Sequence, residues 1–277
     1  MVAVAAAKAK TLDAVFIADL HLTSEEHDCL QLAEQFLTTI APKAHKLFIL
    51  GDLVEYWVGD DAYDGSLDSV FRQLAALLGH GTKSYLMHGN RDFLLGESFA
   101  RQFNCELITA DSYRLVAQSP GQSDLLLMHG DTLCTDDHEY QGMRKLLRSS
   151  QWQQEFLGLS KDERHQQARA IRQQSADKTA QKADAICGVN PLSVAEEMAK
   201  QGVTRLLHGH THRPASHTVD LVSASSDSTT ADSTTRVATT GQRWVLGDWH
   251  PSGAIYGVKE NNQVGLRHWP NGNRFEG

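Results

Sequence analysis

Seven side chains with metal-binding oxygen or nitrogen atoms stand just behind apolar runs in this sequence. They occur in IADLHL, ILGDLVEYW, MHGNRDF, LLMHGD and LLHGHTH, and they are Asp19, His21, Asp52, Asn90, His129, His208 and His210. Asp19 and His21 are two positions apart, so an extended backbone directs both side chains to one face. Because each run is a candidate strand, one sheet edge could gather all of these groups.

The donor set indicates the kind of metal and the number of ions. Oxygen and nitrogen ligands without a thiolate suit divalent Mn, Fe or Zn. Seven ligands exceed the usual coordination of one ion, and they suit two ions that share a carboxylate about 3.5–4 Å apart. Such a pair holds a phosphoryl group and generates a hydroxide nucleophile. The pattern therefore predicts metal-assisted hydrolysis of a phosphate compound.

Each motif is weak evidence by itself. One D-x-H is expected by chance in a chain with 14 histidines, and a Gly-Asp pair behind a strand is usually a turn. The ordered set behind successive strands carries the prediction, and His212 is given no role. The histidines interpreted as solvated or core residues are His27, His45, His80, His88, His138, His165, His217, His250 and His268.

Short apolar runs alternate with helical stretches. Strands are predicted at residues 14–18, 46–50, 83–87, 113–117, 125–128 and 204–208. Most are continuously apolar, as expected for strands covered on both faces. Helices are predicted near residues 27–40, 67–79 and 96–103. Shorter alternating strands follow residue 208, so the predicted fold class is α/β, or α+β in some schemes.

Three segments fall outside this alternation. Residues 138–200 lack strand signal and are rich in Gln, Ala, Lys and Arg, which predicts a helical cap inserted into a core of residues 11–137 and 201–277. Residues 223–235, SASSDSTTADSTT, are too polar to pack and are predicted to form a mobile loop. Residues 1–10 are predicted to be a disordered tail, since their apolar residues precede the lysines, the reverse of a secretory signal.

Composition excludes several classes of protein. The 277 residues are 41% hydrophobic and 22% charged, which is typical of a globular protein, and no run reaches the roughly 18 apolar residues of a membrane span. A formal charge of −8 argues against a general nucleic-acid binder. The cysteines are scattered without a CxxC pair, which indicates reduced thiols in a cytosol; they are Cys29, Cys105, Cys134 and Cys187.

The ordered motifs resemble those of the calcineurin-like metallophosphoesterases. That family's signature is D-x-H, GD, GN, H and G-H-x-H, and DLH, GDL, GNRD, MHGD and HGHTHRP carry it between about residues 13 and 270. The resemblance implies an αββα sandwich with a di-metal site at one edge. It implies that one ion is bound by Asp19, His21, Asp52 and His210. It implies that the other is bound by Asp52, Asn90, His129 and His208.

Longer stretches resemble the branch of this family that acts on UDP-2,3-diacylglucosamine in lipid A biosynthesis. They are FIADLHL, ILGDLVEYWVGDD, HGNRDFLLG, MHGDTLCTDD and HGHTHRPA. The resemblance implies that metal-activated water attacks the α-phosphorus of the pyrophosphate, giving 2,3-diacylglucosamine 1-phosphate (lipid X) and UMP. It also implies two Mn²⁺ ions, a lipidated UDP-sugar as substrate, no nucleic acid, and a peripheral position on the cytoplasmic face of the inner membrane.

The same resemblance assigns roles to individual residues. The implied catalytic residues are Arg91, Asn90 and His129. The implied substrate contacts are Asn90, Arg91, Asp137, Ser175, Thr179, Lys182 and His208. The contacts in the cap rest on the alignment of RQQSADKTAQKADAICGVN, which is less constrained than the metal motifs.

The presence of Arg91 in GNRDF favours cleavage of a phosphoanhydride over cleavage of an ester. Much of the wider family has a histidine here, positioned to protonate an alkoxide leaving group. Arginine cannot donate a proton usefully because its pKa exceeds about 12. A phosphate monoester leaves unassisted, since its second pKa is about 6, and an arginine can clamp phosphate oxygens as charge builds. The structural alternative is that Arg91 merely pairs with Asp92.

Weaker signals admit two interpretations. Asp92, Asp60 and Asp61 are either partners of ligand histidines or turn residues, and Cys134 is interpreted as structural. Apolar cap residues form either the cap's own core or a wall for acyl chains; they are Leu146, Leu147, Trp152, Phe156, Leu157, Leu159 and Ile171. Basic cap residues are either solvated or face an anionic membrane; they are Arg144, Lys145, Arg148, Arg164, Arg169 and Arg172.

Two other functions stay open. Another metallophosphoesterase of the same fold, acting on a nucleotide or a phosphodiester, would require the acid histidine and a basic open groove. A non-catalytic scaffold would normally have lost ligands, whereas every ligand position of the motif set is filled here.

Overall fold

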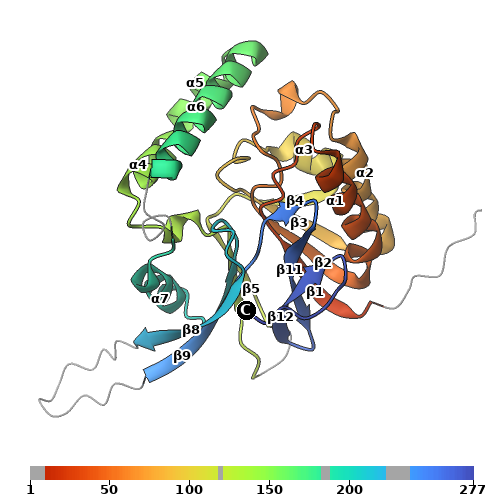
Figure 1. The fold of residues 1–277 in the computed structure, drawn as a ribbon, viewed down its shortest axis with the longest axis vertical. Coiled ribbons are helices and arrows are strands. Elements are labelled where there is room, and N and C mark those ends of the chain that lie inside the picture. Colours follow the sequence, from red (N-terminus) through yellow and green to blue (C-terminus); the bar gives the residue numbers. More distant parts are fainter. Residues whose placement is uncertain (1–9, 118–120, 182–187, 223–237) are drawn as a thin grey trace, which may run out of the picture.

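The structure, a computed structural model, describes residues 10–117, 121–181, 188–222 and 238–277. Two sheets lie face to face at the centre, helices cover both outer sides, and a helical projection stands above one edge (Figure 1). The predicted tail, apart from residue 10, and the predicted loop at 223–235 lie outside the described residues.

The first sheet has the strand order β10-β11-β1-β2-β3-β4, with β12 paired to β11. Strands β1 to β4 are parallel, and antiparallel β11 pairs with the other side of β1. The bounds are β1 (Leu12–Ile17), β2 (Ala44–Leu50), β3 (Lys83–Met87), β4 (Cys105–Ile108), β10 (Trp249–His250), β11 (Gly253–Glu260) and β12 (Gln263–Trp269). Parallel strands point their carboxyl ends to one edge, where ligand sites of such sheets are found.

The second sheet has the order β5-β6-β7-β9-β8. Strands β6, β7 and β9 are parallel, and antiparallel β5 and β8 form the two edges. The bounds are β5 (Ser112–Leu115), β6 (Leu125–Met128), β7 (Arg205–His208), β8 (Ala215–Val222) and β9 (Ala238–Val245). The carboxyl ends of β6 and β7 carry the histidine motifs.

Apolar side chains from both sheets fill the space between them. Phe16, Phe48 and Tyr85 of the first sheet stack with ring centroids 5.6 and 4.6 Å apart, and Leu127 and Leu207 of the second sheet join the same cluster. Side chains alternate between the two faces of a strand, so the other residues of β1 and β2 face the helices. This explains why these strands are apolar throughout.

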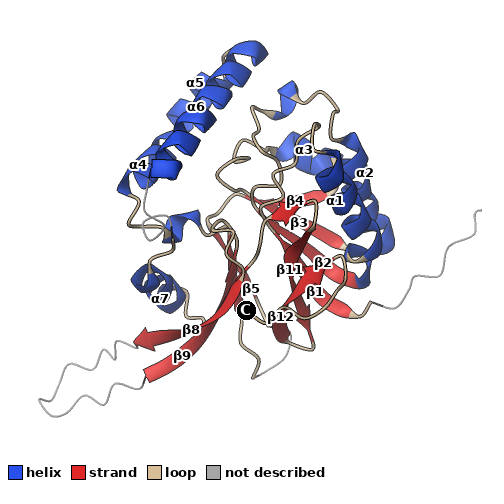
Figure 2. Ribbon diagram, in the orientation of Figure 1, coloured by secondary structure: helices blue, strands red, loops and turns tan. Residues whose placement is uncertain are grey.

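Helices cover the outer face of each sheet (Figure 2). On the first sheet lie α1 (His27–Thr39), α2 (Asp68–Ala76) and α3 (Glu97–Gln102), and on the second lies α7 (Pro191–Lys200). Short 3-10 turns are η1 (Ala41–Lys43), η2 (Asp60–Ala62), η3 (Leu77–His80) and η4 (Asp131–Leu133). The αββα arrangement confirms the predicted fold class.

The projection is a cap formed by α4 (His138–Leu147), α5 (Ser150–Leu157) and α6 (Lys161–Gln181). Asp137 and Ser149 accept hydrogen bonds from the first turns of α4 and α5, which fixes where these helices begin. Phe156 is buried in the core beside the first sheet, and Trp152 packs against it. Helix α7 lies within the predicted cap segment, but its Val194 and Met198 pack on the second sheet.

Two elements differ from the sequence-based expectation. Strand β4 was not predicted, because CELI is short and alternates a charged residue with apolar ones. The predicted helix at 67–79 ends at Ala76 and continues as the 3-10 turn η3. Among the described residues, no helix is both long and apolar enough to cross a membrane.

Candidate metal centre

Left-handed backbone conformations gather at the strand ends that carry the candidate ligands. Non-glycine residues with positive φ include Asp19 (56°), His21 (48°), Asp52 (53°), His210 (68°) and His212 (54°). Such conformations cost about 1–3 kcal/mol each and persist where the surroundings enforce them, commonly at functional sites. The chain therefore turns sharply behind β1, β2 and β7, and each turn delivers side chains to the edge shared by the two sheets.

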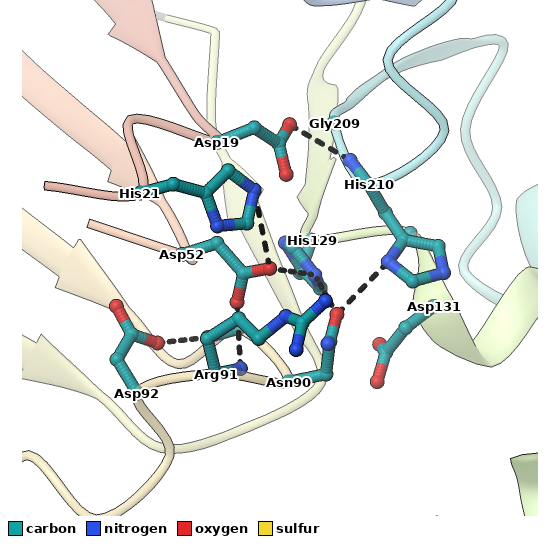
Figure 3. Close-up of polar contacts among 12 residues, drawn as sticks. Asp19, His21, Asp52, Asn90, Arg91, Asp92, His129, Asp131, Gly209 and His210 are labelled. Atoms are coloured by element: carbon teal, nitrogen blue, oxygen red, sulfur yellow. Dashed lines mark hydrogen bonds and ion pairs between the residues drawn. The ribbon is translucent and has the colours of Figure 1, made fainter. Parts of the chain in front are cut away.

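Glycines allow these turns to approach one another. A Cβ atom at Gly89 would collide with the carboxylate of Asp52, and one at Gly209 would collide with the carboxylate of Asp19. Asp19 Oδ2 also accepts a hydrogen bond from His210 N at 2.9 Å (Figure 3). The glycines of the GN and GH motifs are thus required for the close packing of loop against carboxylate.

Asp19, His21 and His212 form the first donor group, with ligand atoms that all lie within 4.8 Å of one another. The Nε2 atoms of the two histidines are 3.2 Å apart, and His212 Nε2 is 3.6 Å from Asp19 Oδ1. Asp19 Oδ1 is buried and has no hydrogen-bond partner. A buried carboxylate oxygen without a donor is costly unless a cation balances it. These donors fit a divalent metal ion.

We define the second donor group as Asp52, Asn90, His129 and His210; ligand atoms of Asp52 and His129 also lie within 4.8 Å of Asp19. Asn90 Oδ1 lies 3.0 Å from both His129 Nε2 and His210 Nδ1 (Figure 3). Asp52 Oδ2 lies 3.8 Å from His129 Nε2 and 3.9 Å from His21 Nε2. Because Asp52 faces both groups, its carboxylate is placed to bridge two ions.

Protonation of the histidines follows from their burial and their partners. His129 Nδ1 lies 2.9 Å from the carbonyl oxygen of Leu50, and donation there leaves the Nε2 lone pair directed at the donor group. Burial and the nearby His129 lower the pKa of His210 to about 4. Burial disfavours charge on His212, but contacts with Asp19 and Asp248 raise its pKa to about 10. A metal ion must therefore displace a proton from His212.

His208 lies outside both donor groups, which corrects its predicted roles as a metal ligand and substrate contact. It is the last residue of β7 and is fully buried. Its Nδ1 faces the carbonyl oxygen of Gly209 at 2.9 Å, and its Nε2 is 3.2 Å from the guanidinium of Arg243. Burial and that cation lower the pKa of His208 to about 3. A ring held between a carbonyl and a guanidinium cannot also face the shared edge.

The histidine pair of the site is therefore shifted by two residues. His210, predicted for the first ion, lies beside Asn90 in the second group, and His212, which received no role, lies in the first. The motif contained the signal, since the glycine of G-H-x-H is Gly209 and its histidines are then His210 and His212.

Two carboxylates that the sequence analysis missed hold the first-group histidines from behind. Glu55 Oε2 is 2.8 Å from His21 Nδ1, an ion-pair contact without hydrogen-bond geometry, and Asp248 Oδ2 is 3.1 Å from His212 Nδ1. A carboxylate at Nδ1 fixes the ring orientation and makes Nε2 the ligand atom. No spacing rule in the sequence points to either residue, because Asp248 comes from the far end of the chain.

The carboxylates that the sequence offered as partners of ligand histidines contact other groups instead. Asp92 is buried and accepts from Leu53 N at 2.7 Å and Gly89 N at 2.8 Å, so its oxygens hold loops and do not pair with Arg91. Burial and Asp52 raise the pKa of Asp92. Asp60 accepts from Trp57 Nε1, Gly96 N and Phe99 N, and Asp61 pairs with Arg164.

Arg91 stands where the donor groups meet a cleft. Its backbone N donates to Asp52 Oδ1 at 2.8 Å, whereas its side-chain Nε is buried and has no hydrogen-bond partner. The cleft runs between the core and the cap. Its walls include Phe93, Leu147, Trp152, Phe156 and Ile171. An anionic group at Arg91 would thus adjoin an apolar chamber.

The remaining predicted substrate contacts are spread around the cap. Asn90, Arg91 and Ser175 line the cleft. Asp137 is mostly buried and accepts a hydrogen bond from Tyr140 N as the cap of α4. Thr179 belongs to α6, and Lys182 lies outside the described residues.

Most of the basic cap residues form contacts within the chain. The pairs are Arg144 with Asp131 and Asp111, Arg148 with the carbonyl oxygen of Gly89, Arg164 with Asp61, and Arg172 with Glu55. Lys145 and Arg169 are exposed. The four paired arginines therefore form neither a solvated face nor a face toward an anionic membrane.

Comparison with protein families identifies the type of fold and site. The family described as calcineurin-like phosphoesterase matches residues 13–214. The chain belongs to this family. Its two donor groups give this calcineurin-like phosphoesterase a site for divalent metal ions at the edge shared by the sheets.

Relatives of this calcineurin-like phosphoesterase cover nearly all of it. A UDP-2,3-diacylglucosamine hydrolase of Chromohalobacter salexigens is 41% identical over 86% of this chain and 89% of its own length. Hydrolases with the same name from Pseudomonas aeruginosa and Yersinia enterocolitica are 40% and 38% identical. They cover 90% and 89% of this chain, and 96% and 95% of their own lengths.

Proposed function

We propose that this chain hydrolyses the pyrophosphate bond of UDP-2,3-diacylglucosamine, a step of lipid A biosynthesis. A relative that is 40% identical over 90% of the chain carries this substrate in its name. The observation that carries the proposal is the position of Arg91, between donor groups for divalent ions and an apolar cleft. In a phosphoanhydride that bears acyl chains, the phosphates suit the donor groups on one side of Arg91, and the acyl chains suit the apolar cleft on the other.

The proposed cofactors are two Mn²⁺ ions, since carboxylate, amide and imidazole donors suit that ion. The proposed ligands of the first ion are Asp19, His21, Asp52 and His212. The proposed ligands of the second ion are Asp52, Asn90, His129 and His210. When bound, such a pair supplies Lewis acidity, which activates a water molecule and offsets charge on phosphoryl oxygens.

In the proposed reaction a water oxygen attaches to the α-phosphorus and the bond from this phosphorus to the bridging oxygen breaks. The products are UMP, which keeps the new oxygen, and 2,3-diacylglucosamine 1-phosphate, while the protons of the water pass to solvent. The departing group is a phosphate monoester, which needs no proton donor. Arg91 lines the cleft and supports the departing group by donating hydrogen bonds from its guanidinium to phosphate oxygens.

The apolar cleft is the proposed acyl-chain site. Trp152 and Phe156 stack with ring centroids 4.7 Å apart, and both line the cleft with Ile171 of α6. Each methylene that leaves water contributes about 0.8 kcal/mol, so two acyl chains offer ample binding energy. Ser175 lines the same cleft, and Thr179 follows one turn later in α6. Together with Asp137 and Lys182 they are the proposed polar contacts of the substrate.

A peripheral position on the cytoplasmic face of the inner membrane is also part of the proposal. The substrate is an amphiphile, and the cap exposes Leu146 and Leu157. Lys145, next to Leu146, is exposed as well and can meet anionic headgroups. Binding to anionic vesicles that falls when Leu146 and Leu157 are replaced by Ser would support this part.

The test of the proposed activity compares three substrates at equal Mn²⁺. The diacylated UDP-sugar should be cleaved far faster than UDP-N-acetylglucosamine or an aryl phosphodiester. In ¹⁸O water the label should appear in UMP, because the α-phosphorus is attacked. Faster cleavage of the phosphodiester would favour another phosphoesterase activity, and label in the sugar phosphate would refute the direction of attack.

A further inference from the structure

A chain of three side chains connects the cap to the first donor group. Arg172 of α6 forms an ion pair with Glu55 Oε1, and Glu55 Oε2 is 2.8 Å from His21 Nδ1. His21 Nε2 in turn lies 3.2 Å from His212 Nε2. Each carboxylate oxygen of Glu55 therefore has a separate partner, one in the cap and one in the donor group.

Glu55 is enclosed where these groups meet. It follows β2 in the stretch that also supplies Asp52, and its side chain is 18% exposed. His21 Nδ1 forms no hydrogen bond with any described residue, so its contact with Glu55 is electrostatic; a ring turned away from Glu55 would lose this contact and aim Nε2 elsewhere. Arg172 fixes the carboxylate in the same way, since an ion pair restricts its rotation.

We propose that Glu55 and Arg172 are positioning residues that couple the closure of the cap to the assembly of the first metal site. With α6 seated, Arg172 holds Glu55, and Glu55 holds His21 in the orientation that binds the ion. With α6 displaced, Glu55 loses this constraint and the ion is held more weakly. Coupling of this kind is reciprocal, so the bound ion also holds α6 on the core.

A second anchor of α6 provides a matched control. Arg164 donates to both oxygens of Asp61 and to the carbonyl oxygen of Val58 at 2.6 Å, and it lies about two turns before Arg172. These contacts attach α6 to the core without touching a donor group. A purely structural role for Arg172 predicts that the two anchors behave alike, whereas coupling predicts that they differ.

The proposal rests on the metal site described above, but not on the identity of the substrate. It is tested with the full chain and Mn²⁺ alone. Mn²⁺ affinity is measured by calorimetry, and amide hydrogen exchange is followed in residues 161–175 with Mn²⁺ or with chelator. The variants are Glu55→Gln, Arg172→Gln and Arg164→Gln, each checked for folding by circular dichroism in chelator.

In the wild type, Mn²⁺ should slow exchange in α6. Glu55→Gln should weaken the binding of one ion by about 10–100-fold, the range found for outer partners of metal ligands. Glu55→Gln and Arg172→Gln should both abolish the effect of Mn²⁺ on α6. Arg164→Gln should speed exchange in α6 under both conditions, yet keep the metal effect. If Glu55→Gln does not fold, Arg172→Gln and Arg164→Gln still separate the two roles.

The proposal is overturned if Mn²⁺ does not change the rate of amide hydrogen exchange in α6 of the wild type. It is also overturned if Glu55→Gln binds Mn²⁺ normally, or if the two arginine variants respond alike. The substrate proposal can fail separately. If Mn²⁺ binds and slows exchange in α6, but the diacylated UDP-sugar is not cleaved, the substrate proposal is wrong and this inference stands.

Discussion

His21 and His212 are 191 residues apart in the chain, and their Nε2 atoms face each other at 3.2 Å. Each ring is held from behind by a carboxylate, Glu55 for His21 and Asp248 for His212. Two lone pairs cannot be brought this close without a proton or a cation between them. In the metal-free protein a proton lies between the two Nε2 atoms, which agrees with the raised pKa of His212. The same arrangement becomes a ligand pair once a divalent ion displaces that proton.

The first prediction separates His212 from His208. His212→Ala should lose one of two Mn²⁺ ions and lower kcat by at least about a hundredfold, because a ligand is removed. His208→Asn should keep both ions and lose mainly stability, because its ring contacts Gly209 and Arg243 instead. Metal analysis by mass spectrometry and thermal unfolding check both variants. Loss of an ion from His208→Asn, with two retained in His212→Ala, would restore the assignment made from the sequence.

The second prediction concerns Asp52, which faces both donor groups. Asp52→Ala should lower the affinity for both ions and reduce turnover below detection. Asp19→Ala should weaken mainly the ion of the first group, since the unpartnered oxygen of Asp19 lies 3.6 Å from His212 Nε2. Mn²⁺ titrations with activity measured in parallel check this. Two tightly bound ions in Asp52→Ala would exclude a bridging role.

The third prediction concerns Arg91. Arg91→Ala should lower kcat by about 10²–10³-fold with both ions retained, because donors to developing charge typically contribute that much. Arg91→His should not restore the rate, since a phosphate monoester needs no proton donor. The measurement is turnover of the diacylated substrate at saturating Mn²⁺. Near-normal turnover by Arg91→His would refute the argument from the leaving group.

The fourth prediction concerns the cap. Trp152→Ala should raise KM for the diacylated sugar nucleotide more than for UDP-N-acetylglucosamine, because its ring lines the cleft and is only partly buried in the core. Phe156→Ala should also lower the melting temperature, since Phe156 is 4% exposed and belongs to that core. Substrates with progressively shorter acyl chains check this. An equal loss on lipidated and soluble substrates would favour a purely structural role.

The fifth prediction is a pH dependence of the metal-free protein. The pKa of His212 is raised from 6.5 to about 10 on folding, chiefly by Asp19 and Asp248 against the cost of burial. Its stabilising contribution is complete below pH 6.5 and is lost as the pH rises through about 10. Urea unfolding in chelator should therefore show falling stability over this range, and His212→Gln should flatten the curve. An unchanged slope in His212→Gln would assign the effect to other groups.

Sequence reasoning succeeded where local pattern and packing agree. Continuous apolar runs located β1, β2, β3 and β6, since both faces of these strands are buried. It failed where the position of a side chain depends on contacts between residues that are far apart in the sequence. The exact turn behind β7 decides whether His208 or His212 faces the shared edge, and only the φ values and the Arg243 contact reveal it. Glu55 and Asp248 were missed for the same reason.

The cap arginines show a second limit. The sequence left them either solvated or facing an anionic membrane, yet Arg144, Arg148, Arg164 and Arg172 each have a partner in the chain. Composition cannot distinguish a solvated arginine from one paired with a carboxylate that lies elsewhere in the sequence. These pairs form because α4, the residue behind it and α6 lie against the loops behind β2, β3, β4 and β6.

Strands β6 and β7 are paired neighbours, with Met128 aligned to His208. The cap and α7 therefore form one long crossover between adjacent parallel strands, a connection whose length hardly affects the pairing at its two ends. Two histidines of the centre lie just behind these strands, His129 behind β6 and His210 behind β7. The connection can accordingly be resized during evolution while the side chains on the two sheets keep their places, provided that α6 keeps its contact with Glu55. Related enzymes could acquire new substrates by changing the rest of this one insertion.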